Sequence, residues 1–310
     1  MVAGTSKAYK ITKNRLQLLL MASLGFLFLI VFAYIPMFGI VLAFKQGDGY
    51  LNILDAMVNS PWAGLDNFRA FLTDRDFLNV MRNTIGLNLL QLAINFPAPI
   101  IFALLINEIR AKGFRRRVQT VANFPHFLSW VIFGGIILML LNMDTGVVNA
   151  ALIRLGFVDE AVNFGEARYF WGTIIITSLM KGIGWGSLIY VAAISGIDPT
   201  LYEAAEIDGA NRFQKMRHIT IPSIAGTITL FFILSVSNLL SNGFEHIWVF
   251  QNQINLSRSE VIDTYVYKHG IIGLRYSYTT AVGLFKSIVA FILLLSGHYT
   301  SKRLTGRGVF

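Results

Sequence analysis

The sequence has no cysteine among its 310 residues, which excludes disulfide bonds, thiolate metal sites and cysteine nucleophiles. It also has few charged residues: Asp, Glu, Lys and Arg make up 14% of the chain, and only 17 residues are acidic. No G-x4-G-K-[ST] phosphate loop occurs, and neither H-E-x-x-H nor G-x-S-x-G is present. These absences argue against a P-loop nucleotide hydrolase, a zinc protease and a serine hydrolase.

The residues that are present give the composition of an integral membrane protein. Hydrophobic residues make up 55% of the chain, and the mean hydropathy is +0.59. A helix needs roughly 20 apolar residues to cross the hydrocarbon core, where its backbone groups must bond internally. Six stretches qualify, so we expect an all-α membrane protein with six transmembrane helices in one domain, residues 1–310. The predicted spans are 16–44, 84–106, 118–141, 171–194, 223–242 and 279–298.

Basic residues are concentrated in alternate connecting segments. With the N-terminus inside, the cytoplasmic segments hold fifteen Lys and Arg and five Asp and Glu, whereas the outer segments hold nine and twelve. This positive-inside bias predicts that both termini are cytoplasmic. It also accounts for the net charge of +9, so no nucleic-acid partner is needed. We interpret the basic run at 110–117 as an orientation signal that lies against anionic headgroups of the lipid bilayer.

One cytoplasmic segment, residues 198–222, is a polar island between two apolar spans. Asp198 followed by Pro199 is a helix-start signal, and Gly209 is a helix breaker, so we predict a short helix over 199–208. Its composition alone favours a connecting loop whose amphipathic helix lies on the membrane surface, since such interfacial helices are common. On a 3.6-residue period one thin face of this helix carries Leu201, Ala204, Ala205 and Asp208.

The spacing within this island resembles a known motif. The sequence is similar to the EAA loop, EAA-x3-G-x9-I-x-L-P, of permease subunits in type I binding-protein-dependent ABC importers. It departs from that pattern at one position, where Ile221 replaces the usual Leu. The stretches FPHFLSWV (124–131) and NMDTGVVNAALIRLGF (142–157) resemble the oligosaccharide branch of these permeases in Gram-positive bacteria. The residues that match the EAA motif are Glu203, Ala204, Ala205, Gly209, Ile219 and Pro222.

The resemblance implies a fold, partners and a mechanism. The fold would be that of a type I ABC importer permease, with the island as a coupling helix that docks on a separate ATPase. Glu203 would contact the ATPase, Ala204 and Ala205 would form the docking face, and Gly209 would permit the turn. The partners would be a second homologous permease, two ATPase subunits that carry ATP and Mg, and an extracellular solute-binding protein. This chain would bind no cofactor or metal and would lie in the plasma membrane.

Polar residues within the spans are candidates for contact with the transported oligosaccharide. Lys181 and Lys286 fall near the middle of spans four and six, where a charge is expensive and suggests a cavity. Because lysines suit carboxylates, we hypothesise an acidic, uronate-containing substrate. Snorkelling to the interface and helix packing are the competing interpretations of these residues. The predicted cavity residues are Lys181, Trp185, Lys286, Asn88, Asn95, Asn238 and Asn242.

Two other classes of protein agree less well with the sequence than an importer does. An ion-coupled secondary sugar carrier would normally carry carboxylates inside its spans, but all 17 acidic residues fall in loops or at span ends. A membrane enzyme would need a cluster of catalytic groups, and no catalytic residue is predicted because the histidines are scattered over both faces. They are His126, His218, His246, His269 and His298.

Overall fold

The computed structural model describes residues 13–305, and these residues form helices and turns. Within this range β pairing is limited to one isolated bridge between Lys45 and Trp62. The predicted all-α fold is therefore confirmed. Lys7, Lys10 and Arg307, which contribute to the predicted orientation, lie outside the described residues.

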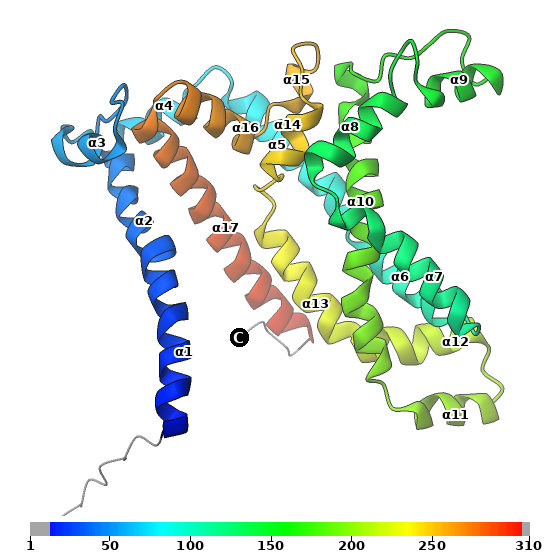
Figure 1. Ribbon diagram of the computed structural model, residues 1–310. Coiled ribbons are helices and arrows are strands. Elements are labelled where there is room, and N and C mark those ends of the chain that lie inside the picture. Colours follow the sequence, from blue (N-terminus) through cyan, green and yellow to red (C-terminus); the bar gives the residue numbers. More distant parts are fainter. Residues whose placement is uncertain (1–12, 306–310) are drawn as a thin grey trace, which may run out of the picture.

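Five continuous helical segments are long and apolar enough to cross a membrane, and one bent helix pair passes the same test when its two halves are taken together (Figure 1). The segments are Leu16–Phe44, Phe77–Asn107, Ala167–Ser195, Arg212–Ser237 and Tyr276–Thr300, and the bent pair is Lys112–Phe127 with Trp130–Leu140. Their helices are α1 (Lys13–Leu29), α2 (Ile35–Met37), α5 (Phe77–Ile94), α6 (Pro97–Asn107), α7 (Lys112–Asn123), α8 (Trp130–Leu140), α10 (Ala167–Ser195), α12 (Arg212–Lys215), α13 (Ile221–Ser237) and α17 (Tyr276–Thr305).

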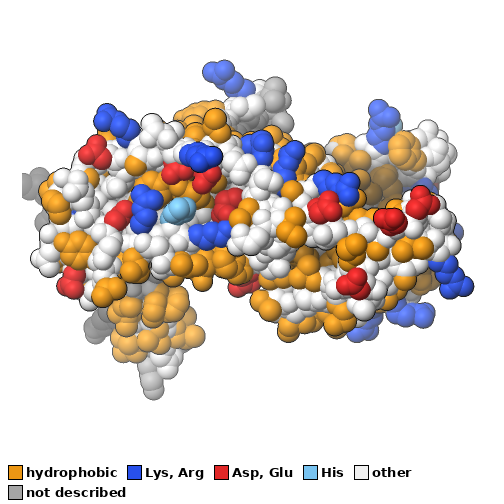
Figure 2. All heavy atoms as spheres, turned by 90° about the horizontal axis from the view of Figure 1, so that it is seen from above, with side chains coloured by type: hydrophobic (Ala, Val, Ile, Leu, Met, Phe, Trp, Pro, Cys, Tyr) orange, Lys and Arg blue, Asp and Glu red, His pale blue; other side chains and the backbone are white. Residues whose placement is uncertain are grey.

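Shorter helices connect the spans at both ends of the molecule. They are α3 (Ile53–Asn59), α4 (Asp66–Leu72), α9 (Val147–Arg154), α11 (Pro199–Ile207), α14 (Phe244–Phe250), α15 (Leu256–Ser259) and α16 (Ile262–Val266). Helix α11, the start of α1 and the end of α17 lie at one end of the molecule, whereas α3, α4, α9, α15 and α16 lie at the other (Figure 1). This second end, seen from above in Figure 2, carries Lys, Arg, Asp and Glu side chains between apolar ones.

The third span differs from the prediction of one helix over 118–141. A short 3-10 turn, Phe124–Phe127, follows α7, and the two halves of the span meet at an angle of 102°. Pro125 cannot donate the backbone hydrogen bond that a continuing helix needs. Ser129 then starts α8, because its side chain accepts a hydrogen bond from the N–H of Ile132. Hydropathy did not reveal the break, because it averages over a window and the two halves pass together as apolar enough to cross a membrane.

Helix α10 is the helix on which the body of the molecule packs. It contacts α5, α6, α7, α13, α14 and α15. Its apolar residues Phe170 and Ile174 are buried in a core with Leu87 of α5 and Ile247 of α14. Burial of such side chains stabilises the helix pairs by contact, while their lipid-facing surfaces remain exposed.

Helix α1 stands apart from this body (Figure 1). The most apolar stretch of this first span has no residue buried against the rest of the chain. The loop after this first span is nevertheless attached to the last one. One carboxylate oxygen of Asp48 accepts hydrogen bonds from the N–H groups of Ser277 (2.9 Å) and Tyr278 (3.2 Å) at the start of α17. Because these N–H groups have no partner within the helix, Asp48 acts as their cap from 229 positions away.

Candidate functional site

Helix α11 forms the exposed tip of the polar island and follows the predicted bounds closely. It runs from Pro199 to Ile207, one residue short of the predicted end. The Asp198 side chain accepts a hydrogen bond of 3.0 Å from the N–H of Thr200, as the helix-start signal predicted. This bond to the backbone of Thr200 holds the pKa of Asp198 below its ordinary value.

The turn after α11 is fixed by a glycine and an ion pair. Gly209 has a φ of +73°, which a residue with a side chain adopts only under strain. Lys215 of α12 then returns to Glu206 of α11, with its Nζ 2.6 Å from the carboxylate. The hydrogen bond and the charge of Lys215 lower the pKa of Glu206. The island is therefore a helix and a return turn held in one shape.

The side chains of the island that the EAA motif singles out face mainly outward. Glu203 and Ala204 are exposed, whereas Ala205 is half-buried. Two large apolar side chains are exposed as well: 48% of Leu201 and 87% of Ile207. Such apolar exposure beside small residues is a surface suited to a partner protein. A shallow hollow of about 350 Å³ lies behind the turn; among its lining residues are Ala205, Asp208, Gly209 and Ile219.

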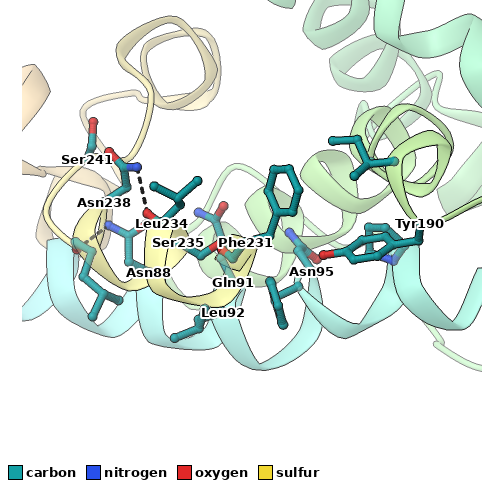
Figure 3. Close-up of a pocket in the computed structure, with 15 residues that line it drawn as sticks. Asn88, Gln91, Leu92, Asn95, Tyr190, Phe231, Leu234, Ser235, Asn238 and Ser241 are labelled. Atoms are coloured by element: carbon teal, nitrogen blue, oxygen red, sulfur yellow. Dashed lines mark hydrogen bonds between the residues drawn. The ribbon is translucent and has the colours of Figure 1, made fainter. Parts of the chain in front are cut away.

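A second candidate site is a cavity between the spans whose lining carries polar side chains among apolar ones. Its volume is about 510 Å³, and residues of α5, α6, α10 and α13 and of the segment after α13 surround it (Figure 3). Amides, hydroxyls and aromatic rings provide its polar and stacking surface. The lining residues are Asn88, Gln91, Leu92, Asn95, Phe96, Pro99, Gly186, Ile189, Tyr190, Phe231, Leu234, Ser235, Asn238, Leu239 and Ser241.

Two amides of α5 and the amide of Asn95, the residue that follows it, form a stripe along one wall of this cavity. Asn88, Gln91 and Asn95 are three and seven positions apart, so they share one helix face (Figure 3). The side-chain amide of Asn88 donates a hydrogen bond of 2.8 Å to the carbonyl of Leu239, which fixes the orientation of that amide. Within the described residues the buried Nε2 of Gln91 and Oδ1 of Asn95 have no hydrogen-bond partner. A ligand with hydroxyl groups would satisfy both atoms.

Of the seven residues predicted for the cavity, the structure places Asn88, Asn95 and Asn238 in its lining. The prediction overlooked Gln91. This residue is three positions after Asn88 and four before Asn95, a helical spacing that places the three side chains on one face. The prediction also overlooked Tyr190, because an apolar run gives no sign of which face is turned inward.

Lys181 and Trp185 do not line this cavity. The ammonium of Lys181 donates to the carbonyls of Pro125 (3.3 Å), His126 (3.1 Å) and Leu128 at the break of the third span. The indole of Trp185 stacks on the ring of His126, with 4.4 Å between the centroids, and 47% of it is exposed. A proline break leaves carbonyls without helical partners, and this lysine supplies the missing donors.

Lys286 and Asn242 lie beside the cavity instead of in its lining. Lys286 of α17 forms an ion pair with Asp263 of α16 and donates to the hydroxyl of Ser241 at 3.3 Å. The other oxygen of Asp263 accepts from the N–H of Asn242 at 2.9 Å. The charge of Lys286 is therefore partly balanced by an acid from the segment between the fifth and the sixth span, which the sequence had placed in a separate loop.

No group of three or more His, Asp or Glu that could hold a metal occurs within residues 13–305.

Known proteins resemble this chain in sequence and in fold. "Protein LplB" of Bacillus subtilis (strain 168) is 41% identical over 92% of this chain and 88% of its own length. The "Polygalacturonan/rhamnogalacturonan transport system permease protein YteP" of the same strain is 40% identical over 94% and 90%. A chain in the crystal structure of a bacterial ABC transporter involved in the import of the acidic polysaccharide alginate is 35% identical, with a TM-score of 0.86 over 97% of this chain and 100% of that one.

The profile of one protein family matches residues 95–306, which include the cavity wall from Asn95 onward and the whole polar island. The match covers more than half of the chain and agrees with the relatives in both sequence and fold. The chain therefore belongs to the family described as the inner membrane component of binding-protein-dependent transport systems.

Proposed function

We propose that this chain is a permease subunit of an ATP-driven importer and forms half of the path for an acidic oligosaccharide. The observation that carries the proposal is the cavity of about 510 Å³, whose amides, hydroxyls and aromatic rings are groups that bind sugars. The relatives support the acidic class, since one is named for polygalacturonan and another takes part in alginate import.

The same proposal covers the rest of the complex. The whole chain, residues 1–310, acts as one permease domain in the plasma membrane, with both termini in the cytoplasm. It pairs with a second permease and with two ATPase subunits, and a solute-binding protein delivers the sugar from outside. A crystal structure that resembles this chain, with a TM-score of 0.87, contains an alginate transporter with its pentasaccharide-bound periplasmic protein. ATP and Mg reside on the ATPase, because this chain has no phosphate loop.

Coupling runs through the polar island. The ATPases close on ATP and move α11, and the spans that continue from the island turn the cavity from the inside to the outside. Glu203, Ala204 and Leu201 form the surface that docks on the ATPase. Gly209 and the Glu206–Lys215 pair keep that surface in shape, so that the movement reaches α13.

Co-purification tests the docking step. We expect a tagged chain, expressed with candidate partners, to elute with a second permease and an ATPase pair. Glu203→Arg reverses a charge on the docking surface and Gly209→Val strains the turn, so each should release the ATPase but retain the second permease. The control is Glu160→Arg, an exposed glutamate in the segment between α9 and α10. A wild-type chain that elutes alone, or only with itself, contradicts the proposal.

Substrate-stimulated ATP hydrolysis tests the cavity. In the reconstituted complex, Gln91→Leu and Asn95→Leu each remove hydrogen bonds to sugar hydroxyls and should lower kcat/KM for the sugar about fivefold to tenfold. Gln17→Leu alters an exposed residue of α1 and should leave it unchanged. Equal effects of all three changes would show that the cavity does not bind the sugar.

A further inference from the structure

The charge cluster beside the cavity joins three parts of the chain. Lys286 lies within the last span, Asp263 on α16, and Ser241 with Asn242 on the segment that follows α13. The Lys286 ammonium is paired with the Asp263 carboxylate and lies 3.3 Å from the Ser241 hydroxyl. The side chains of both charged residues are partly buried, with 23% and 18% exposed. Their pairing is therefore less screened than that of a surface pair.

This cluster borders the cavity through Ser241, which is one of the lining residues. Figure 3 shows Ser241 and Asn238 at one end of the cavity, away from Tyr190. The fifteen lining residues include no charged side chain. The cavity lining itself therefore offers partners to the hydroxyl groups of a sugar but no charge to its carboxylates. Lys181 is occupied by the carbonyls of the third span. Lys286, in contrast, donates a hydrogen bond to Ser241, which lines the cavity.

The cluster also contains a buried side-chain amide without a hydrogen-bond partner among the described residues. Asn242 is 6% exposed, and both its Oδ1 and its Nδ2 lack a hydrogen-bond partner within residues 13–305. Buried amides are normally satisfied, so a donor and an acceptor stand ready for a ligand here. An ammonium has three N–H donors, and the two contacts of Lys286 leave one of them available. A free carboxylate next to Ser241 would find donors from Lys286 and from the hydroxyl of Ser241 itself.

We propose that Lys286 is the residue that reads a carboxylate of the acidic oligosaccharide, and that Asp263 occupies the place of this carboxylate while the path is empty. The inference rests on the proposed function of the chain and specifies how its substrate class is selected. When a uronate carboxylate arrives, it takes the ammonium of Lys286, and Asp263 keeps its bond to the N–H of Asn242. The exchange replaces one carboxylate by another on the ammonium, and Asp263, which keeps only the N–H of Asn242, is then no longer paired with a cation.

Release of Asp263 has a mechanical consequence. The pair connects α16, at the outer end of the molecule, to the middle of α17. A neutral sugar cannot replace the carboxylate and leaves this connection in place. Arrival of an acidic sugar would loosen it at the moment when the cavity is filled.

A structural ion pair and a substrate-reading lysine predict different mutational patterns. In proteoliposomes that contain the full complex and its binding protein, uptake of an alginate oligosaccharide and of an oligogalacturonate is measured. Lys286→Met should raise KM for uptake about tenfold or more, as expected when a charged hydrogen bond is lost. Asp263→Asn removes the competitor and should leave KM equal or lower. The double variant Lys286→Met with Asp263→Leu should restore thermal stability but not uptake, and Lys286→Arg should recover most of the uptake.

The chain offers a matched control in Lys268 and Glu260. These residues form an ion pair of 2.5 Å in the outer segment, and neither lines the cavity. Lys268→Met with Glu260→Gln should leave KM unchanged. Equal losses for Lys286→Met and Asp263→Asn, with recovery of uptake in the double variant, would overturn the inference and leave the proposed function intact. A wild-type complex that transports a neutral oligosaccharide but neither acidic one would overturn the proposed acidic substrate and the inference together.

Discussion

Lys181, in the middle of α10, donates a hydrogen bond of 3.1 Å to the main-chain carbonyl of His126, at the break between α7 and α8. The same ammonium also reaches the carbonyls of Pro125 and Leu128. It lies 5.0 Å from the centroid of the Trp130 ring, which adds a cation–π contact. A broken span without water needs donors for its free carbonyls, and one lysine provides them.

Replacing this lysine should destabilise the protein. Lys181→Met leaves up to three carbonyls without a donor, at about 1–3 kcal/mol for each buried group. We expect a lower melting temperature in detergent, measured by the loss of the monodisperse peak after heating. Lys112→Met, at an exposed position of α7, should melt like the wild type. Unchanged melting of Lys181→Met would mean that the carbonyls find other donors.

Gly184 allows the backbones of α10 and α7 to touch. A Cβ placed there would lie 2.3 Å from the carbonyl oxygen of Ala122, and backbone atoms cannot move aside cheaply. Gly184→Ala should therefore lower stability by about 1–3 kcal/mol, the typical range for overpacking. Gly182→Ala, two residues earlier, meets no atom within 4 Å and should be neutral or slightly stabilising. Thermal melting of the two variants side by side tests this contrast.

The Glu206–Lys215 pair should control the docking surface in a pH-dependent way. The pKa of Glu206 lies below its ordinary value of 4.5, so the pair contributes above that pH and is lost as pH falls through the lowered pKa. Glu206→Lys and Lys215→Glu should each weaken ATPase binding, and the exchanged pair should restore it. The readout is the amount of ATPase retained on the tagged chain at neutral pH. Failure of the exchange to restore binding would assign Glu206 a direct contact with the ATPase.

His246 of α14 should make the protein less stable in acid. This side chain is 4% exposed, its ring stacks on Trp130, and its Nε2 lies 2.9 Å from the hydroxyl of Thr177. Burial, reinforced by the charge of Lys181, lowers its pKa from 6.5 to about 3. Between these values the unfolded chain binds a proton that the folded protein excludes, so stability falls as pH drops below 6.5.

Melting temperatures between pH 7 and pH 4 measure this effect. The wild type should lose stability across this interval, and His246→Phe should lose less of it, because a ring of similar shape binds no proton. The control is His218→Asn, which alters an exposed histidine of the polar island and should keep the slope of the wild type. Identical slopes for wild type and His246→Phe would contradict a buried neutral imidazole.

The spans and the polar island could be predicted from the sequence because their signals are local. A run of apolar residues is long enough to cross the membrane, or not, whatever packs against it. Asp198 caps α11 through a bond to an N–H two residues away, and Gly209 is required by its own φ angle. Cap, turn and hydropathy each depend on a few neighbouring residues.

Only the tertiary structure decided what the polar residues of the spans contact. Lys181 and Lys286 look alike in the sequence, yet one supplies donors to a broken helix and the other pairs with an acid from the segment before the last span. Asn88 lines the cavity whereas Asn242 lies beside it, because the rotation of α5 and the path of the segment after α13 set these positions. These relations depend on how helices far apart in the chain pack together, and hydropathy contains no term for that packing.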